Sequence, residues 1–490
     1  MNAKRGTVWL IMISIVLLIG AFFSQTAHAR EWFDILTTPL EDPLLTLPQQ
    51  LATGKHLPGD GQIHFCQMDV YDISHPLTLL TAIDVALCHN PRVRNAWVQI
   101  KIQAAQLGEA RSAYLPTITM GTSRLQQKSE QKEKLLTVIS ERDNESKYAS
   151  LTWRLLDCGG RDANRRSANA LLEAAMAGHD ETLQSTMATV IGLYFDAQTA
   201  KATLEAKIQG EVFAKQTLKI AEQRESRGTG ERSDTLQAKT TLSKAELEHA
   251  RAQGSYEKAL VGLIVGLGLP PQALQPPNLI LAQDYQDTES GVQQELSEWL
   301  HIAQNEHPAL ISARAQLEAA KERKIVVRSE GLPTLDYTQS QYINGRPNQG
   351  LSSLESKENV AGMTLTIPLF EGFGRTYKVR DAEAQIELKT TELQEIQNQI
   401  LAEIAKAHTN ALASLRGLDA AKRLFDTAQE ALINVRRKYD QGITDILEML
   451  QVQMAFEDAQ QERLRAMADW RAARLRLLAS AGTLGLKDIR

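Results

Sequence analysis

Apolar residues recur every three or four positions along two very long stretches of the chain. Neither stretch, about Arg161 to Arg227 or about Arg375 to Asp440, contains a proline. A continuous helix of roughly 66 residues would be roughly 100 Å long. The apolar seam of the second stretch comprises Ile396, Ile400, Ile404, Ala407, Ala411, Leu415, Leu418, Ala421, Phe425, Ala428, Leu432, Val435 and Tyr439. This spacing predicts long amphipathic helices that pack along one face against other helices.

A turn follows each long stretch, and a second helical pattern follows the turn. Gly228 lies in the first turn and Gly442 in the second. Two antiparallel helical hairpins are therefore predicted, over about 161–267 and 375–480.

Four shorter segments predict β-strands, near 115–127, 147–157, 333–345 and 358–369. The fourth alternates most clearly, because threonines separate Met363, Leu365 and Ile367. The segment 128–146 is dense in lysine and glutamate, and 346–357 is rich in asparagine, serine and glycine. Both are expected to be mobile tips. The pattern thus predicts two β-hairpins, at about 115–157 and 333–369.

The same order of elements occurs twice along the chain. Pro91 precedes the first predicted β-hairpin and Pro308 the second, 217 positions later. Beyond the β-hairpins the offset becomes 214, as between Gly160 and Gly374, and it is then maintained. A constant offset indicates an internal duplication. The predicted division of the chain is a first repeat at 77–269, a proline-rich connector at 270–291 and a second repeat at 292–485.

The first 29 residues predict a secretory signal peptide. Lys4 and Arg5 precede an apolar run, and small residues around His28 fit a cleavage site. A retained N-terminal anchor is the alternative. Residues 30–76 contain several prolines and predict an extended segment. No later segment reaches about 18 uncharged apolar residues, so any later membrane crossing must be made by strands.

Composition and charge argue against several classes of function. The formal net charge is -5, and no basic run suits nucleic acid, so no nucleic-acid partner is predicted. The ten histidines are scattered, and the common phosphate-binding, zinc and serine-hydrolase motifs do not occur. We therefore expect no enzyme activity, no catalytic residues, no cofactor and no metal site.

The chain has three cysteines, Cys66, Cys88 and Cys158. In an oxidising compartment, Cys66 and Cys88 could form a disulfide that ties the N-terminal segment to the first helix. Free thiols, or a metal site with His64 and His89, are the alternatives. Cys158 is left unpaired by this assignment.

Four antiparallel strands cannot close into a barrel, and exposed strand edges are costly in lipid. Two copies of the chain would supply eight strands around a packed interior, whereas three copies would supply twelve strands and leave a lumen. The predicted fold class is therefore a mixed α and β membrane protein. It is expected to form a homotrimer with a 12-stranded transmembrane β-barrel, continued by a long α-helical barrel in the periplasm.

Motifs at the element boundaries carry a family resemblance. They are Asn90-Pro91, Leu115-Pro116-Thr117, the sequences at 156–161 and 367–375, and the turn from Tyr439 to Gln451. From about Leu77 to Leu484 the chain resembles the TolC family of outer membrane efflux proteins. The segment from Ala86 to Pro91, with a cysteine upstream, is most similar to the subgroup that serves type I secretion.

The resemblance implies a passive channel-tunnel in the outer membrane, with the helical barrel in the periplasm. Its helical tip would dock on a periplasmic adaptor protein and an inner-membrane transporter, such as an ABC transporter. The resemblance also implies a gate at the tips of the helical hairpins. Asp234 and Tyr439 fall on the positions of a latch, Glu448 on an acidic constriction, and Gly228 and Gly442 in the turns that contact the adaptor.

Simpler interpretations of these residues remain open. Tyr439 continues the apolar seam and could be a core residue. Asp234 could favour the start of a returning helix through its charge, and Glu448 could be a solvated helix residue. Thr444 stands where the family has a second latch residue, an arginine, and Gln451 where it has another acidic residue. The resemblance therefore does not extend to the second link or to half of the acidic constriction.

The predicted function is export through the outer membrane, with an exported polypeptide as cargo. Efflux of small molecules through the same fold is the first alternative, because the inner-membrane partner selects the cargo. A soluble periplasmic coiled-coil scaffold is an alternative from another class. The apolar strand face of Met363, Leu365 and Ile367 argues against it, since a soluble scaffold has little use for such a face.

Overall fold

A computed structural model describes residues 76–133, 136–269, 280–282, 295–347, 356–441 and 443–485. The predicted signal peptide and nearly all of the predicted N-terminal segment, Cys66 included, lie outside the described residues, as does most of the connector. Among the residues that the structure describes, none of the helices combines the length and the apolar composition that crossing a bilayer requires.

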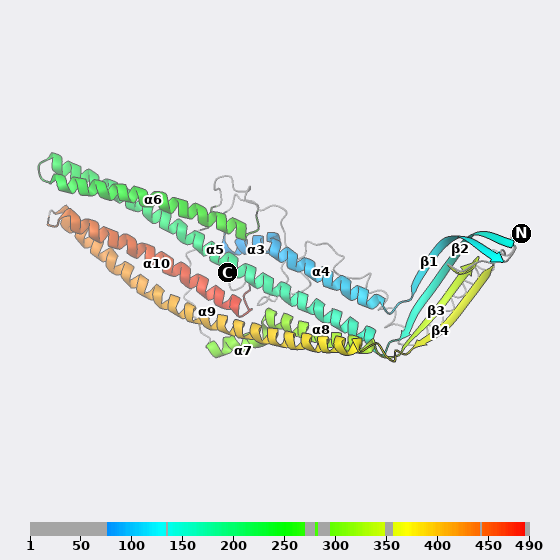
Figure 1. Cartoon of the computed structure of the whole chain (residues 1–490). Helices are drawn as coiled ribbons and strands as arrows, with labels where there is room; N and C mark the ends of the chain where they lie inside the picture. The colour runs from blue at the N-terminus through cyan, green and yellow to red at the C-terminus, as the bar shows by residue number, and fades with distance from the viewer. Residues whose placement is uncertain are drawn as a thin grey trace, which may run out of the picture. The chain divides into compact units, whose positions relative to one another are not determined.

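The described elements occur in the same order in both halves of the chain (Figure 1). The first half contains α3 (Leu79–His89), α4 (Pro91–Ser112), β1 (Thr117–Glu133), β2 (Leu136–Leu156), α5 (Gly160–Ser226) and α6 (Arg232–Gly266). The second contains α7 (Leu296–Glu306), α8 (Pro308–Ser329), β3 (Thr334–Ile343), β4 (Lys357–Thr366), α9 (Gly374–Asp440) and α10 (Ile446–Ser480). The helix α6 returns beside α5, and α10 returns beside α9 (Figure 1).

One sequence-based expectation is wrong. The polar segment 128–146 was expected to be a mobile tip, but β1 and β2 continue through almost all of it. The two strands stay in antiparallel register, with Lys128 opposite Glu141. Arg124 also pairs with Asp143 across the strands at 3.0 Å. A backbone ladder needs no apolar face, so the loss of hydrophobic alternation does not mark the end of a strand.

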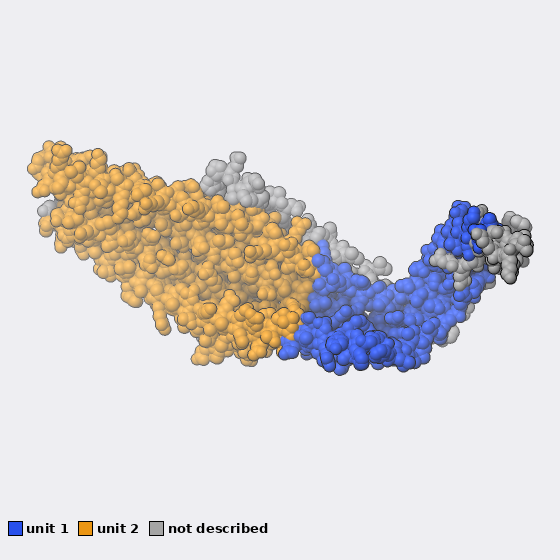
Figure 2. Space-filling model, in the orientation of Figure 1, with its two compact units in different colours: residues 1–48, 101–172, 318–387 blue, residues 49–100, 173–317, 388–490 orange. Residues whose placement is uncertain are grey.

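The chain forms two compact units (Figure 2). The described part of unit 1 comprises 101–133, 136–172, 318–347 and 356–387, and it contains the sheet. Unit 2 contains most of the two helical hairpins. The boundary falls within the helices α4, α5, α8 and α9.

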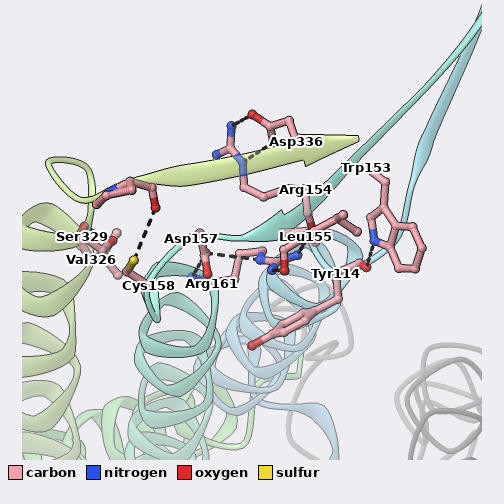
Figure 3. Close-up of polar contacts among 12 residues, drawn as sticks. Tyr114, Trp153, Arg154, Leu155, Asp157, Cys158, Arg161, Val326, Ser329 and Asp336 are labelled. Carbon is pink, nitrogen blue, oxygen red and sulfur yellow. Dashed lines mark hydrogen bonds and ion pairs between the residues drawn. The ribbon is translucent and has the colours of Figure 1, made fainter. Parts of the chain in front are cut away.

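In unit 1, the four strands form one antiparallel sheet in the order β1-β2-β3-β4. The bend from β2 into α5 is held by Arg161 (Figure 3). Its guanidinium donates to the carbonyl oxygens of Arg154 at 2.7 Å and Leu155 at 3.2 Å, and it pairs with Asp157 at 3.2 Å. It also lies over the ring of Tyr114, 5.1 Å from the centroid. These contacts satisfy carbonyl groups that the strand no longer pairs at the bend.

Arg375 makes similar contacts at the bend between β4 and α9. Its guanidinium donates to the carbonyl oxygen of Gly331 at 3.2 Å and pairs with Glu371. Both bends use two consecutive residues with positive φ. These are Cys158 and Gly159 in the first bend and Gly372 and Phe373 in the second. Left-handed backbone at a non-glycine residue costs on the order of 1 kcal/mol, which the surrounding contacts must offset.

In unit 2, the helices pack around three apolar clusters. One joins α3, α5, α6 and the end of α10 around Ile83, Met187, Tyr194 and Leu263. A second joins α7 and the start of α8 to α9 and α10 around Trp299, Ile404 and Trp470. The third lies where the two helical hairpins end.

A polar residue before each short proline-initiated helix caps it. Asn90 Oδ1 accepts a hydrogen bond from the amide of Arg92 at 2.9 Å. In the second half, His307 Nδ1 accepts from the amide of Ala309 at 3.2 Å. Proline suits the first helical position because its missing N–H would be unpaired there. Burial lowers the pKa of His307 to about 4, since a charged imidazolium is disfavoured away from water.

The lowered pKa of His307 predicts a pH-dependent loss of stability. Its folded-state pKa lies below the ordinary value of about 6.5, so its contribution is complete above pH 6.5 and is lost as pH falls towards 4. The loss amounts to at most about 3 kcal/mol. Thermal unfolding of the purified protein at pH 7.5 and 4.5 measures it. His307→Asn keeps a capping acceptor without titrating, so its melting temperature should fall less on acidification. Equal falls in the two proteins would contradict the prediction.

Candidate functional site

The ends of the two helical hairpins share one apolar cluster, which we call the tip cluster. Its buried members are Ala221, Ala238, Val435, Tyr439, Ile446, Met449 and Leu450. They come from the end of α5, the start of α6, the end of α9 and the start of α10. The tip cluster therefore holds the first helical hairpin against the second.

Tyr439 is buried in the tip cluster with 2% of its surface exposed, as the core interpretation expected. It also has a specific partner on the other hairpin. The guanidinium carbon of Arg224, on α5, lies 4.3 Å from the centroid of the Tyr439 ring. Arg224 also donates to the carbonyl oxygen of Tyr439 at 3.1 Å. A cation over a largely desolvated aromatic face is worth up to about 2 kcal/mol.

The α5–α6 turn holds Arg224 in place. The carbonyl oxygen of Arg224 accepts hydrogen bonds from the amide of Thr229 at 2.9 Å and from its hydroxyl at 3.2 Å. Gly228 in this turn is exposed and has a φ of +71°. A Cβ atom at Gly230 would lie 2.9 Å from Cβ of Arg224, so the turn closes tightly on the arginine.

The predicted latch partner Asp234 lies half-buried in the first turn of α6. The contacts described above for the Tyr439 ring and carbonyl oxygen are with Arg224. The pairing of Asp234 with Tyr439 therefore stays a prediction. Arg224 was missed because its contact joins residues 215 positions apart and depends on how the hairpins pack.

Glu448 is exposed at the start of α10, and its carboxylate accepts a hydrogen bond from the hydroxyl of Thr444. Its amide donates to Oδ1 of Asp445, the N-cap residue, at 2.8 Å. Glu448 thus takes part in the helix start, and its role in an acidic constriction stays a prediction. Gly442, in the second predicted adaptor-contacting turn, lies outside the described residues.

The cysteines differ in state. Cys88, near the end of α3, is disulfide-bonded. Its predicted partner Cys66 lies outside the described residues, so that pairing stays a prediction. Cys158 is a free, exposed cysteine at the bend before α5, and its thiol donates to the carbonyl oxygen of Pro333 at 3.3 Å (Figure 3).

The two faces of the sheet in unit 1 differ in chemistry. Strand register places on one face Ile118, Met120, Leu151, Trp153, Tyr337, Leu335, Met363 and Leu365. The other face carries Thr117, Thr119, Ser123, Ser146, Ser150, Thr152, Thr338, Ser340 and Thr364. A bulge between Arg154 and Leu156 shifts the register, so that Leu156 joins Leu335 and Leu365 on the apolar face.

Large apolar side chains on the apolar face are exposed. Met120 is 81% exposed and Met363 69% exposed. Hydroxyl groups on the polar face bond across the strands, as between Ser123 and Ser146 at 2.7 Å and between Ser150 and Ser340 at 2.8 Å. A wall with one exposed apolar face and one hydrogen-bonded polar face suits a boundary between lipid and water.

Comparison with known proteins agrees with this geometry. The family model described as "Outer membrane efflux protein" matches residues 82–269 and 299–483, and the chain belongs to this family. The expected resemblance to the TolC family of outer membrane efflux proteins is therefore confirmed. Members of this family are channels, so the chain is a channel protein and not an enzyme.

Individual relatives support the assignment. The chain is 32% identical to the protein CyaE of Bordetella pertussis over 417 residues, which cover 84% of this chain and 85% of that protein. It is 24% identical to the alkaline protease secretion protein AprF of Pseudomonas aeruginosa, covering 62% of this chain and 63% of that protein. The fold is similar to the crystal structure of the outer membrane protein VceC of Vibrio cholerae, with a TM-score of 0.68 at 18% identity. That match covers 82% of this chain and 96% of VceC.

The two sheet faces predict opposite responses to a charge. Met363→Lys puts a charge on the apolar face, where it costs about 2–4 kcal/mol at the middle of a bilayer. It should sharply reduce the amount of folded protein in isolated outer membranes, measured by immunoblotting of unheated samples. Thr364→Lys puts the same charge on the polar face one residue later, beside Asp336, and should be tolerated. Equal loss in both variants would contradict the assignment of the faces.

Proposed function

We propose that the chain is the outer-membrane channel of a tripartite export system, and that it works as a homotrimer. The observation that carries the proposal is the four-stranded sheet with one apolar and one polar face, in a chain of the outer membrane efflux family. The apolar face contacts outer-membrane lipid, and the polar face lines a water-filled passage.

Three copies are proposed because a single sheet leaves β1 and β4 as edges. Unpaired backbone groups at an edge cost several kcal/mol each in lipid. Three sheets of four strands would pair every edge and form a twelve-stranded barrel wide enough for a lumen. The internal duplication fits this arrangement, because each repeat contributes one β-hairpin and one helical hairpin to the wall.

Exposed apolar residues on the helices support further contacts with neighbouring copies. They include Ile208, Val212, Leu236, Leu247, Val261, Leu424, Ile433, Leu447 and Met454. These side chains are exposed in the single chain, whereas another face of the same helices is buried. In the proposed trimer they pack against adjacent subunits, and the helices form the periplasmic barrel.

The hairpin ends form the proposed gate. Arg224 and Tyr439 join the first hairpin to the second, so the ends must separate before the helices can move apart. The turns that contain Gly228 and Gly442 are the proposed contacts with a periplasmic adaptor protein, which would recruit an inner-membrane transporter. Asp234 would form a second link to Tyr439, and Glu448 would contribute to an acidic constriction near the axis.

The proposed cargo is a polypeptide, as in type I secretion. The support is the similarity to AprF, which is described as an alkaline protease secretion protein. The polar, hydroxyl-rich sheet face offers no chemistry specific to one cargo, so efflux of small molecules is the alternative. The exposed apolar sheet face argues against a soluble periplasmic scaffold.

The proposed gate predicts which substitutions open the closed channel. Arg224→Gln removes the cation from the Tyr439 ring and should raise the closed-state conductance in planar bilayers severalfold, because up to about 2 kcal/mol is lost per subunit. Arg227→Gln changes an exposed arginine in the same turn and should leave the conductance unchanged.

Tyr439→Phe separates the two proposed links. It keeps the aromatic ring that Arg224 covers but removes the hydroxyl that Asp234 would need. A low conductance in Tyr439→Phe with a high one in Arg224→Gln assigns the link to Arg224. A high conductance in Tyr439→Phe and Asp234→Ala, with a normal one in Arg224→Gln, would assign it to Asp234.

Deletion of the gene in its bacterium tests the export proposal. Specific polypeptides should disappear from the culture medium and accumulate in the cells, as measured by quantitative proteomics, and the plasmid-borne gene should restore them. The protein itself should be recovered in the outer-membrane fraction. An intact set of secreted proteins with increased sensitivity to dyes would instead favour small-molecule efflux. Recovery of the protein in the soluble periplasm would contradict both.

A further inference from the structure

At one register position across the four strands, the polar face of the sheet carries aromatic side chains. Strand register aligns Gly121 on β1, Tyr148 on β2, Tyr342 on β3 and Glu358 on β4. We call these four residues the tyrosine row. On the same face, the next row towards the helices is Thr119, Ser150, Ser340 and Val360. The tyrosine row therefore interrupts a surface of small, mostly hydroxyl side chains.

The ring of Tyr148 lies over the backbone of β1. A Cβ atom at Gly121 would lie 2.7 Å from Cε1 of Tyr148 and 2.8 Å from its Cζ and Oη atoms. No side chain at position 121 is compatible with this ring position unless the ring moves. Glycine thus lets the ring rest on the neighbouring strand, and one face of the ring is turned away from the sheet.

Tyr342 continues the aromatic surface beside Tyr148. The ring centroids are 6.5 Å apart and the ring planes are inclined at 35°. This separation is too large for a face-to-face stack, so the two rings lie side by side.

The chain itself places a cation on one of these rings. The guanidinium of Arg346 lies 5.4 Å from the centroid of Tyr342, and it forms two hydrogen bonds to the Glu358 carboxylate at 2.7 and 3.1 Å. Across the described residues, no arginine or lysine is found over the ring of Tyr148. Tyr148 therefore offers an aromatic face of the same kind, over which no described residue of the chain places a cation.

We infer that the tyrosine row is a binding site for organic cations on the polar face, with the ring of Tyr148 as its contact surface. The site would take the guanidinium and ammonium groups of cargo as it passes. The inference rests on the proposed function, since it requires the polar face to line the passage. Three copies in the proposed trimer would place three such rings at one level of the lumen. An exposed cation–π contact changes affinity by about two- to fivefold, which allows cargo to bind and leave quickly.

The ring could instead serve only to cover the gap at Gly121. In that case Tyr148 would affect the stability of the sheet and not the binding of cations. A binding measurement on the assembled channel distinguishes the two roles.

The test uses block of single-channel current by an octa-arginine peptide, with the full-length protein reconstituted in planar bilayers. A glycine-serine peptide of equal length serves as the uncharged control. Tyr148→Leu should raise the dissociation constant for block by octa-arginine about two- to fivefold. Tyr148→Phe keeps the ring and should match the original protein. Tyr337→Leu removes a tyrosine from the apolar face of the same sheet and should have no effect.

Some outcomes would overturn the inference. An unchanged dissociation constant in a Tyr148→Leu channel of normal conductance would show that the ring only fills space. If Tyr148→Leu fails to assemble, Gly121→Ala combined with Tyr148→Leu refills part of the gap with a methyl group and carries the same test. Absence of any channel in the original protein would overturn the proposed function, and a channel with altered block in Tyr337→Leu would overturn the assignment of the faces.

Discussion

The unpaired backbone edges of a four-stranded sheet are the constraint on which the proposed assembly depends. β1 and β4 each have a hydrogen-bonded strand on one side only within the described chain. Water can pair such an edge, but hydrocarbon cannot. A sheet with an exposed apolar face therefore has to be completed by further strands before it enters lipid. In the proposed trimer, the sheets of the other two copies supply these strands. One sequence therefore forms both the sheet and the strands that close it into a barrel.

The bends and the hairpin ends show how this wall continues into helices. Arg161 and Arg375 satisfy carbonyl groups where the backbone turns from strand to helix. At the other end of the helical hairpins, Arg224 covers the ring of Tyr439. The first two arginines hydrogen-bond to backbone carbonyl oxygens at the bends and also pair with a carboxylate, Arg161 with Asp157 and Arg375 with Glu371. Arg224 contacts one ring and one carbonyl oxygen on the other helical hairpin, as the proposed gate requires.

Sequence patterns predicted the main elements because each has its own period. The seam through Ile404 and Tyr439 has a helical period, and the alternation around Met363 has the period of a strand. Such patterns depend on one apolar face. They could not predict the strands through 128–146, where the backbone ladder continues although apolar and polar residues no longer alternate. Arg224 was missed for a different reason, since nothing near it in the sequence indicates a partner on α9.

The sequence by itself determined the order of helices and strands, the two-sided character of the sheet and the family, because these depend on local periods and on motifs at element boundaries. Only the tertiary structure decided which side chains meet. The packing of α5 against α9 brings Arg224 to Tyr439, and strand register brings Tyr148 over Gly121. These contacts join distant parts of the chain, and their geometry follows from packing and register rather than from any short pattern of residues.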